Sequence, residues 1–151
     1  MLKRILVTIL VSSFLYSCDY TPLYSSKSFQ KINLKIFEIK GDQELNKYIT
    51  SNLNRYVNRD GKNVKIDIDT KYSKNIASRN TKGSISNYKL LASATFNVEV
   101  EGEKKTISFN EDFIMKNLDD NFEKNNYEKT IKKNFSNSIT NKLLLQISSM
   151  K

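Results

Sequence analysis

Every second residue from Tyr88 to Val100 is apolar, and this alternation constrains the fold more than any other part of the chain. A period of two is typical of a β-strand with one dry and one wet face. The stretch therefore predicts a long strand in a sheet that is covered on one side only. The apolar face carries Tyr88, Leu90, Ala92, Ala94, Phe96, Val98 and Val100, and the other carries Lys89, Ser93, Thr95, Asn97 and Glu99.

Three further stretches show the same kind of pattern. Residues 31–39 alternate, but the phase shifts after Ile36, which predicts a bulged strand. Residues 64–72 alternate Val, Ile and Tyr with charged residues, and residues 107–115 follow the tight turn Glu101-Gly102-Glu103. Glu111 falls on the apolar face of this last strand, which we expect only if the strand bulges there.

Two stretches have a helical period instead. Asp42 is a good N-cap for a helix that runs to Asp60-Gly61. Its apolar residues recur at spacings of three and four: Leu45, Tyr48, Ile49, Leu53, Tyr56 and Val57. A second, longer amphipathic helix carries Tyr127, Ile131, Phe135, Ile139, Leu143 and Ile147.

The element order is therefore β-α-β-β-β-α. The first helix is expected to connect two parallel strands, and strands two to four to form an antiparallel meander. One wet sheet face and two one-sided helices predict an α+β fold, a two-layer sandwich of a four-stranded mixed sheet with both helices on one face. Residues 31–151 are expected to form this single domain.

The first residues have the layout of a secretory signal. Lys3 and Arg4 precede an apolar run from Ile5 to Tyr16, and the small residue Ser17 stands before Cys18. The run is too short to span a bilayer comfortably. A lone cysteine is often a small buried hydrophobe, but this one lies outside any expected element. We therefore interpret residues 1–17 as a signal peptide and residues 18–30 as a lipidated tether.

Lipid on Cys18 would hold the domain at a membrane. One acyl chain binds only marginally, whereas several together anchor stably, since each buried methylene adds about 0.8 kcal/mol. The sequence thus predicts a membrane anchor without a spanning helix. The net charge of +9 becomes +7 after residues 1–17 are removed. For an exported protein we expect no nucleic-acid partner. The excess of positive charge favours a solvated basic surface over a dedicated anionic partner.

The composition does not favour an enzyme. The sequence contains no histidine, so the usual acid/base group at neutral pH and imidazole metal sites are absent. No glycine-rich phosphate loop can be assembled, and Asp67 and Asp69 are expected to lie on the solvated strand face beside Lys65 and Lys71. We expect no catalytic residues, no metal site and no cofactor.

Residues 71–89 have the strongest binding character. This segment is expected to be a connection of some fifteen residues, far longer than a hairpin loop needs. It contains five basic residues, Lys71, Lys74, Arg79, Lys82 and Lys89, and no acid lies between Asp69 and Glu99. Lys74, Arg79 and Lys82 are therefore candidates to bind the phosphate or carboxylate groups of an anionic lipid. A flexible solvated loop is the alternative.

Together these features resemble the LPS-assembly lipoprotein family, LptE, of the alphaproteobacterial type. The resemblance rests on "CDYTPLY" at 18–24, on "YKLLASATFNVEV" followed by "ISFNEDF", and on the closing helix "YEKTIKKNFSNSITNKLLLQI". It implies a non-catalytic lipoprotein on the periplasmic face of the outer membrane. Such a protein plugs the LptD β-barrel, helps it to assemble and aids delivery of lipopolysaccharide, with Cys18 as the lipidated residue.

One position departs from the family pattern. Members usually have glycine after the cysteine, where this chain has Asp19. In enterobacteria an aspartate at this place retains lipoproteins at the inner membrane, so inner-membrane retention stays open. A different periplasmic scaffold or binding module, such as a cell-envelope accessory factor, also remains an alternative.

Overall fold

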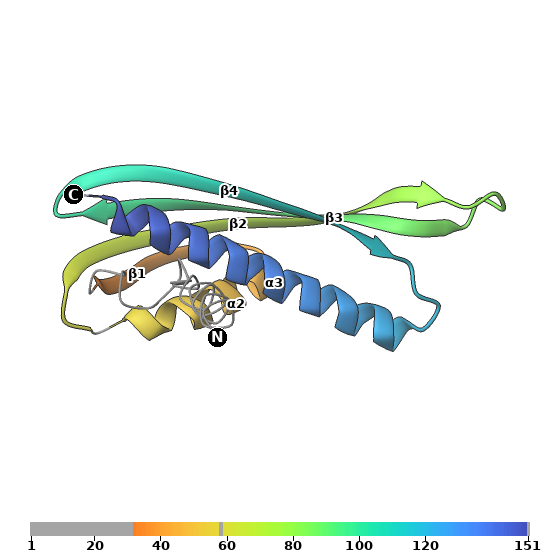
Figure 1. Cartoon of the computed structure of the whole chain (residues 1–151), viewed down its shortest axis with the longest axis horizontal. Coiled ribbons are helices and arrows are strands. Elements are labelled where there is room, and N and C mark those ends of the chain that lie inside the picture. The colour runs from red at the N-terminus through yellow and green to blue at the C-terminus, as the bar shows by residue number, and fades with distance from the viewer. Residues whose placement is uncertain (1–31, 58, 151) are drawn as a thin grey trace, which may run out of the picture.

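The computed structural model describes residues 32–57 and 59–150, so the signal segment and Cys18 lie outside the described residues. The elements follow the predicted order (Figure 1). They are β1 (Ile32–Gly41), α2 (Gln43–Leu53), the 3₁₀ turn η2 (Asn54–Tyr56), β2 (Lys62–Arg79), β3 (Ile85–Val100), β4 (Glu103–Lys116) and α3 (Asn121–Ser148). The fold is α+β, as the sequence predicts.

The sheet has four strands in the order β1-β2-β3-β4. The β1–β2 pair is parallel, and the β2–β3 and β3–β4 pairs are antiparallel, so the sheet is mixed. The predicted bulge in β1 is present, because the register against β2 shifts between Ile36 and Ile39. Strand β2 is longer than β1 and continues well past the end of it.

Both helices cover the same face of the sheet, which makes two layers (Figure 1). The alternating apolar residues of the strands face these helices, and Phe96 at the centre is fully buried. The main core joins Leu34, Ile49, Ile66, Phe96, Val98, Ile139 and Leu143. A smaller cluster lies nearer the start of α3, with Leu45, Leu90, Ala92, Met115, Ile131 and Phe135.

Both helices begin at an aspartate. The Asp42 carboxylate accepts a hydrogen bond from the Leu45 N–H at 2.8 Å, and the Asp120 carboxylate accepts one from the Glu123 N–H at 2.8 Å. Each bond satisfies an N–H that has no partner within its own helix. The N-cap predicted at Asp42 is thus confirmed, and the last helix begins earlier than its apolar period suggests.

Three sequence predictions are wrong in detail. The expected fifteen-residue connection is mostly strand, because β2 runs to Arg79 and β3 begins at Ile85. The first helix ends at Leu53 and continues only as a 3₁₀ turn, rather than reaching Asp60.

The third prediction that is wrong is the bulge expected at Glu111. No bulge interrupts the β3–β4 register. Instead, the Glu111 carboxylate accepts hydrogen bonds from the Ser138 hydroxyl and the Lys142 ammonium, both at 2.7 Å. The carboxylate lies on the helix-covered face because α3 supplies donors for it.

Candidate functional site

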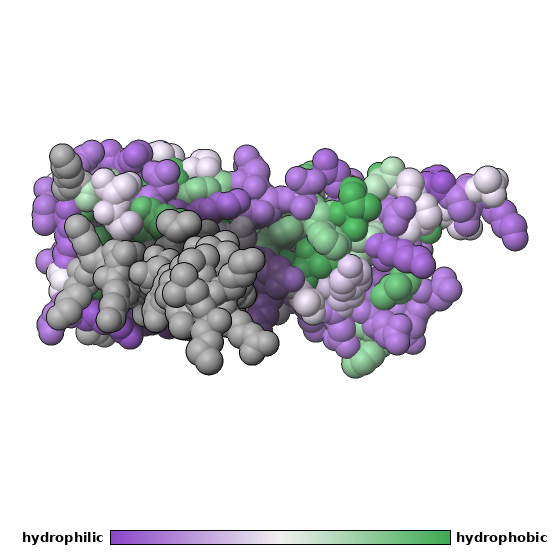
Figure 2. Space-filling view, in the orientation of Figure 1, coloured by the Kyte–Doolittle hydropathy of each residue, from purple (hydrophilic) through white to green (hydrophobic). Residues whose placement is uncertain are grey.

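The β2–β3 hairpin extends beyond the body of the molecule (Figure 1). Pairing of β1 with β2 ends at Gly41 and Thr70, and pairing of β4 with β3 ends at Lys116 and Asn87. Beyond these points the sheet narrows from four strands to three and then to two. Figure 2 shows that the far end of the hairpin carries mainly hydrophilic residues.

The hairpin ends in an ordered turn at residues 80–84. The Asn80 N–H donates to the Ser84 carbonyl at 2.8 Å, and the Gly83 N–H donates to the Asn80 carbonyl at 2.9 Å. The Asn80 side-chain oxygen accepts two more hydrogen bonds, from the N–H groups of Lys82 and Ser84, each at 3.0 Å. This side-chain capping is typical of asparagine in turns, and Gly83 supplies the positive φ of 82° that the turn requires. The tip is therefore built by specific local bonds.

The three predicted lipid-binding residues lie at two different places. Arg79 ends β2 directly before the turn, and Lys82 lies within the turn. The Arg79 Nη1 donates to the Gly83 carbonyl at 2.7 Å and leaves its other N–H groups available. Lys74 lies on the face that looks toward α3, and its ammonium is 2.6 Å from Glu128. The structure thus brings Arg79 and Lys82 together at the tip and places Lys74 in a contact between the hairpin and α3.

That contact is a chain of alternating charges. The Tyr72 hydroxyl donates to Glu128 Oε1 at 2.8 Å, while Lys74 donates to Oε2. Next to it, Lys132 donates to Glu44 of α2 at 2.8 Å and lies 4.1 Å from the centre of the Tyr72 ring. These groups join α2, β2 and α3, and they fix the base of the hairpin to the helix layer.

The environment shifts two pKa values in this cluster. Burial raises the pKa of Tyr72 far above its ordinary value, and the hydrogen bond to Glu128 adds to the effect. Burial alone would raise the pKa of Glu128, but the hydrogen bonds from Lys74 and Tyr72 outweigh it, so this pKa lies below its usual range. Tyr72 is thus a neutral donor and Glu128 an anion at neutral pH.

The uncovered face of the sheet is a polar ladder across the three long strands. The Thr106 hydroxyl donates to Asn97 at 2.9 Å, and the hydroxyls of Thr95 and Ser108 are 3.0 Å apart. One row further, Glu99 contacts Lys65 at 2.9 Å, and this hydrogen bond lowers the pKa of Glu99. The face therefore presents polar side chains whose hydrogen bonds and ion pairs run from strand to strand.

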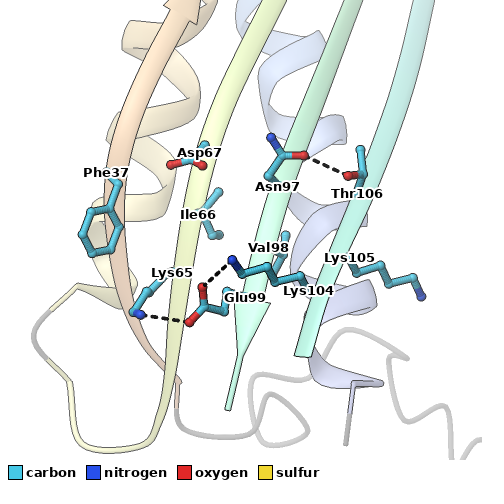
Figure 3. Close-up of a pocket in the computed structure, with 10 residues that line it drawn as sticks. All are labelled: Phe37, Lys65, Ile66, Asp67, Asn97, Val98, Glu99, Lys104, Lys105 and Thr106. Atoms are coloured by element: carbon cyan, nitrogen blue, oxygen red, sulfur yellow. Dashed lines mark hydrogen bonds and ion pairs between the residues drawn. The ribbon is translucent and has the colours of Figure 1, made fainter. Parts of the chain in front are cut away.

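A shallow groove of about 590 Å³ crosses this ladder (Figure 3). Its most exposed apolar wall is Phe37, which follows Ile36 at the bulge of β1 and is 65% exposed. Asn97, Thr106 and Glu99 line the groove opposite, with Lys104 reaching toward Glu99 at 3.9 Å. The groove offers hydrogen bonds and one aromatic surface to a polar partner.

Two kinds of feature are not found in residues 32–57 and 59–150. No group of three or more histidine, cysteine, aspartate or glutamate side chains could hold a metal ion there. Within the same residues, no helix is both long and apolar enough to cross a membrane.

Comparison with solved structures finds matches that include two lipoproteins. A candidate lipoprotein from Caulobacter crescentus CB15 superposes with a TM-score of 0.53 at 12% identity, over 82% of this chain and 91% of that one. Rare lipoprotein B from Shewanella oneidensis gives a TM-score of 0.49 at 14% identity, over 74% of this chain and 96% of that one. No family model and no curated protein sequence matches the chain. The similarity to the Caulobacter protein is a similarity of fold.

Sequence reasoning missed two parts of this surface. The contact of Glu128 with Tyr72 and Lys74 depends on how α3 crosses β2, although the apolar period of α3 indicates which helix face meets the sheet. The exposure of Phe37 follows from the bulge, and its signal is the phase shift after Ile36.

Proposed function

We propose that this chain is an envelope lipoprotein, anchored by lipid on Cys18, that inserts into the lumen of an LptD-type β-barrel and aids transfer of lipopolysaccharide to the outer leaflet. The proposed location is the periplasmic face of the outer membrane, with Asp19 leaving the inner membrane as the other site to test. The role is non-catalytic.

The observation that carries this proposal is the chemistry of the uncovered sheet face. Its middle rows combine Asn97 with Thr106 and Thr95 with Ser108, whereas the opposite face is apolar and covered by both helices. The lumen of a membrane β-barrel is lined by polar side chains. Short hydroxyl and amide groups on this face can exchange hydrogen bonds with such a lining at little cost in side-chain entropy.

Two further observations support the proposal. The layout of residues 1–18 is that of a lipoprotein signal, and the fold is that of a solved candidate lipoprotein. The basic tip, with Arg79 and Lys82 at one ordered turn, supplies cations for the phosphate groups of lipopolysaccharide.

The test is affinity capture of the full chain from detergent-solubilised membranes. We expect a large β-barrel to co-purify with the wild-type protein. Asn97→Arg, which places a long charged side chain in the centre of the ladder, should reduce barrel recovery about tenfold. Asn134→Arg on the exposed side of α3 is the matched control and should leave recovery unchanged.

The anchor is tested separately by the mass and fractionation of the mature protein. Cys18→Ser should remove the acyl mass and release the protein from membranes. Recovery of an unmodified wild-type chain would contradict the anchor. Recovery of an acylated chain that captures envelope proteins but no barrel would point to the other reading, a different periplasmic scaffold.

The lipid role of the tip is tested with purified lipopolysaccharide at low salt, where screening is weakest. The double variant Arg79→Glu with Lys82→Glu should bind several-fold less, while Lys129→Glu with Lys133→Glu on α3 changes the charge equally and should bind normally. Lys74 is left intact because it pairs with Glu128. Equal binding by both double variants would refute the assignment.

A further inference from the structure

Strand β2 has an open edge where β1 stops. The last β1 pair is Gly41 with Thr70, and the Asp42 N–H donates to the Thr70 carbonyl at 3.1 Å as the chain turns away. From Lys71 to Arg79, β2 pairs only with β3 among the residues that the structure describes. The register against β3 is regular from Lys71 to Ile76 and shifts between Ile76 and Arg79. In the regular part, half of the backbone groups of β2 face outward.

The strand period identifies which groups these are. In a β-strand, alternate residues point their backbone N–H and C=O groups to the same side. The Thr70 carbonyl faces β1, so every second residue after Thr70 points its backbone groups to that side as well. The residues that point outward beyond the end of β1 are therefore Tyr72, Lys74 and Ile76. Those between them, Ser73 and Asn75, point their backbone groups toward β3.

Gly41 keeps this edge uncovered. Its φ of 96° turns the chain sharply, and a Cβ built there would lie 1.8 Å from the Thr70 carbonyl oxygen. Only glycine can leave the sheet so abruptly at this point. A hollow of about 790 Å³ begins here and runs across the sheet, lined by Gly41, Asp42 and residues 71–73 of β2, 91–93 of β3 and 110–112 of β4.

Among the described residues, the side chains of β2 itself turn away from the edge. Tyr72 and Lys74 are drawn toward Glu128 of α3, so they lie on the helix side of the sheet. Ile76 is 49% exposed and offers an apolar contact beside the free backbone groups. Exposed apolar side chains gather near the base of the hairpin (Figure 2).

The charge of the hairpin indicates which kind of strand can pair with the free edge of β2. No acidic residue lies between Asp69 and Glu99, and within the described residues Lys71, Arg79 and Lys82 form no ion pair. A second copy of the chain would bring the same cations against this edge, which opposes self-pairing. An acidic strand would instead meet complementary charge.

We propose that the edge formed by residues 71–76 receives an extended, acidic segment of a partner protein as a fifth strand. Backbone hydrogen bonds to Tyr72, Lys74 and Ile76 supply affinity, and the basic side chains supply selectivity. The proposal does not depend on the barrel assignment, since any envelope partner with such a segment would fit.

The test uses amide hydrogen exchange of the full chain by NMR. The probes are peptides of about eight residues in which Glu alternates with Val or Thr, and matched peptides with Lys in place of Glu. The acidic peptides should slow exchange at Tyr72, Lys74 and Ile76 at least tenfold. Ser73 and Asn75, already bonded to β3, should be unaffected.

Ile76→Pro supplies the matched variant, because proline removes an outward N–H without touching the β2–β3 bonds. It should weaken binding of the acidic peptides about tenfold, whereas Ile76→Val should bind normally. If Ile76→Pro lowers the folded fraction, the proposal is judged from the wild-type chain alone, by whether the acidic peptides protect the amides of alternate residues.

Three results would overturn the proposal. The first is no alternating protection with the acidic peptides, and the second is equal protection with the lysine peptides. The third is protection of the same amides either by raising the concentration of the chain alone or by vesicles of phosphatidylglycerol, which would assign the edge to self-association or to lipid.

Discussion

Neutralising Glu128 should loosen the hairpin from the helix layer. The carboxylate is 17% exposed and accepts hydrogen bonds from Tyr72 at 2.8 Å and Lys74 at 2.6 Å. Glu128→Gln keeps the shape and one acceptor oxygen but leaves Lys74 without a counter-charge. A hydrogen bond to a charged group contributes about 1.5–3 kcal/mol, and breaking a buried pair costs more.

The position of Lys74 reduces this cost. Its side chain is 27% exposed, so water partly replaces the lost partner. We therefore expect the free energy of unfolding to fall by about 2 kcal/mol, which moves the urea midpoint by about 1 M for a domain of this size. Glu103→Gln, an exposed carboxylate at the start of β4, removes the same charge and should change stability by less than about 0.5 kcal/mol.

The pH dependence gives an independent check. Because the folded-state pKa of Glu128 is lowered, its contribution is present above the ordinary value of 4.5 and is lost as the pH falls through the lowered one. The stability gap between wild type and Glu128→Gln should thus be constant near neutral pH and close in acid. A gap that persists unchanged in acid, or an equal loss in Glu103→Gln, would refute the reasoning.

The remaining predictions concern the backbone and a helix cap. Gly41→Ala should destabilise the fold by more than about 3 kcal/mol or prevent folding, since its Cβ would overlap the Thr70 carbonyl. Gly83 has a similar φ but open space around it, so Gly83→Ala should cost only about 1–2 kcal/mol. Thermal melting of the two variants distinguishes overlap from φ strain alone, and equal losses would contradict the geometry. Asp120→Ala should cost about 1 kcal/mol through loss of the cap of α3, against almost no change for Asp119→Ala, as measured by urea denaturation.

Local pattern was enough to predict most of the fold. The alternation from Tyr88 to Val100 identified a strand that the structure places inside the sheet, and Asp42 marked the start of a helix. The hairpin was missed because residues 73–87 are mostly Ser, Asn and Lys, which carry no alternating apolar signal. Those residues form strands because backbone pairing and the Asn80 turn hold them.

The candidate site was only partly predictable for a similar reason. The basic character of the hairpin is visible in the sequence, and Arg79 and Lys82 do lie at its tip. The partner of Lys74 belongs to a helix more than fifty positions further on. The free edge depends on where β1 ends relative to β2, a relation between two strands that no local pattern records.

The length of β2 sets the distance between the end of the sheet where the described chain enters the fold and the hairpin turn. At about 3.3 Å per residue, its 18 residues span roughly 60 Å, about twice the thickness of a bilayer's hydrocarbon core. The described chain enters the fold at Ile32, which pairs with Lys62 at the end farthest from the hairpin turn. The hairpin therefore holds the cations of Arg79 and Lys82 roughly 60 Å from the point where the described chain enters the fold, a reach set by the backbone of a single strand.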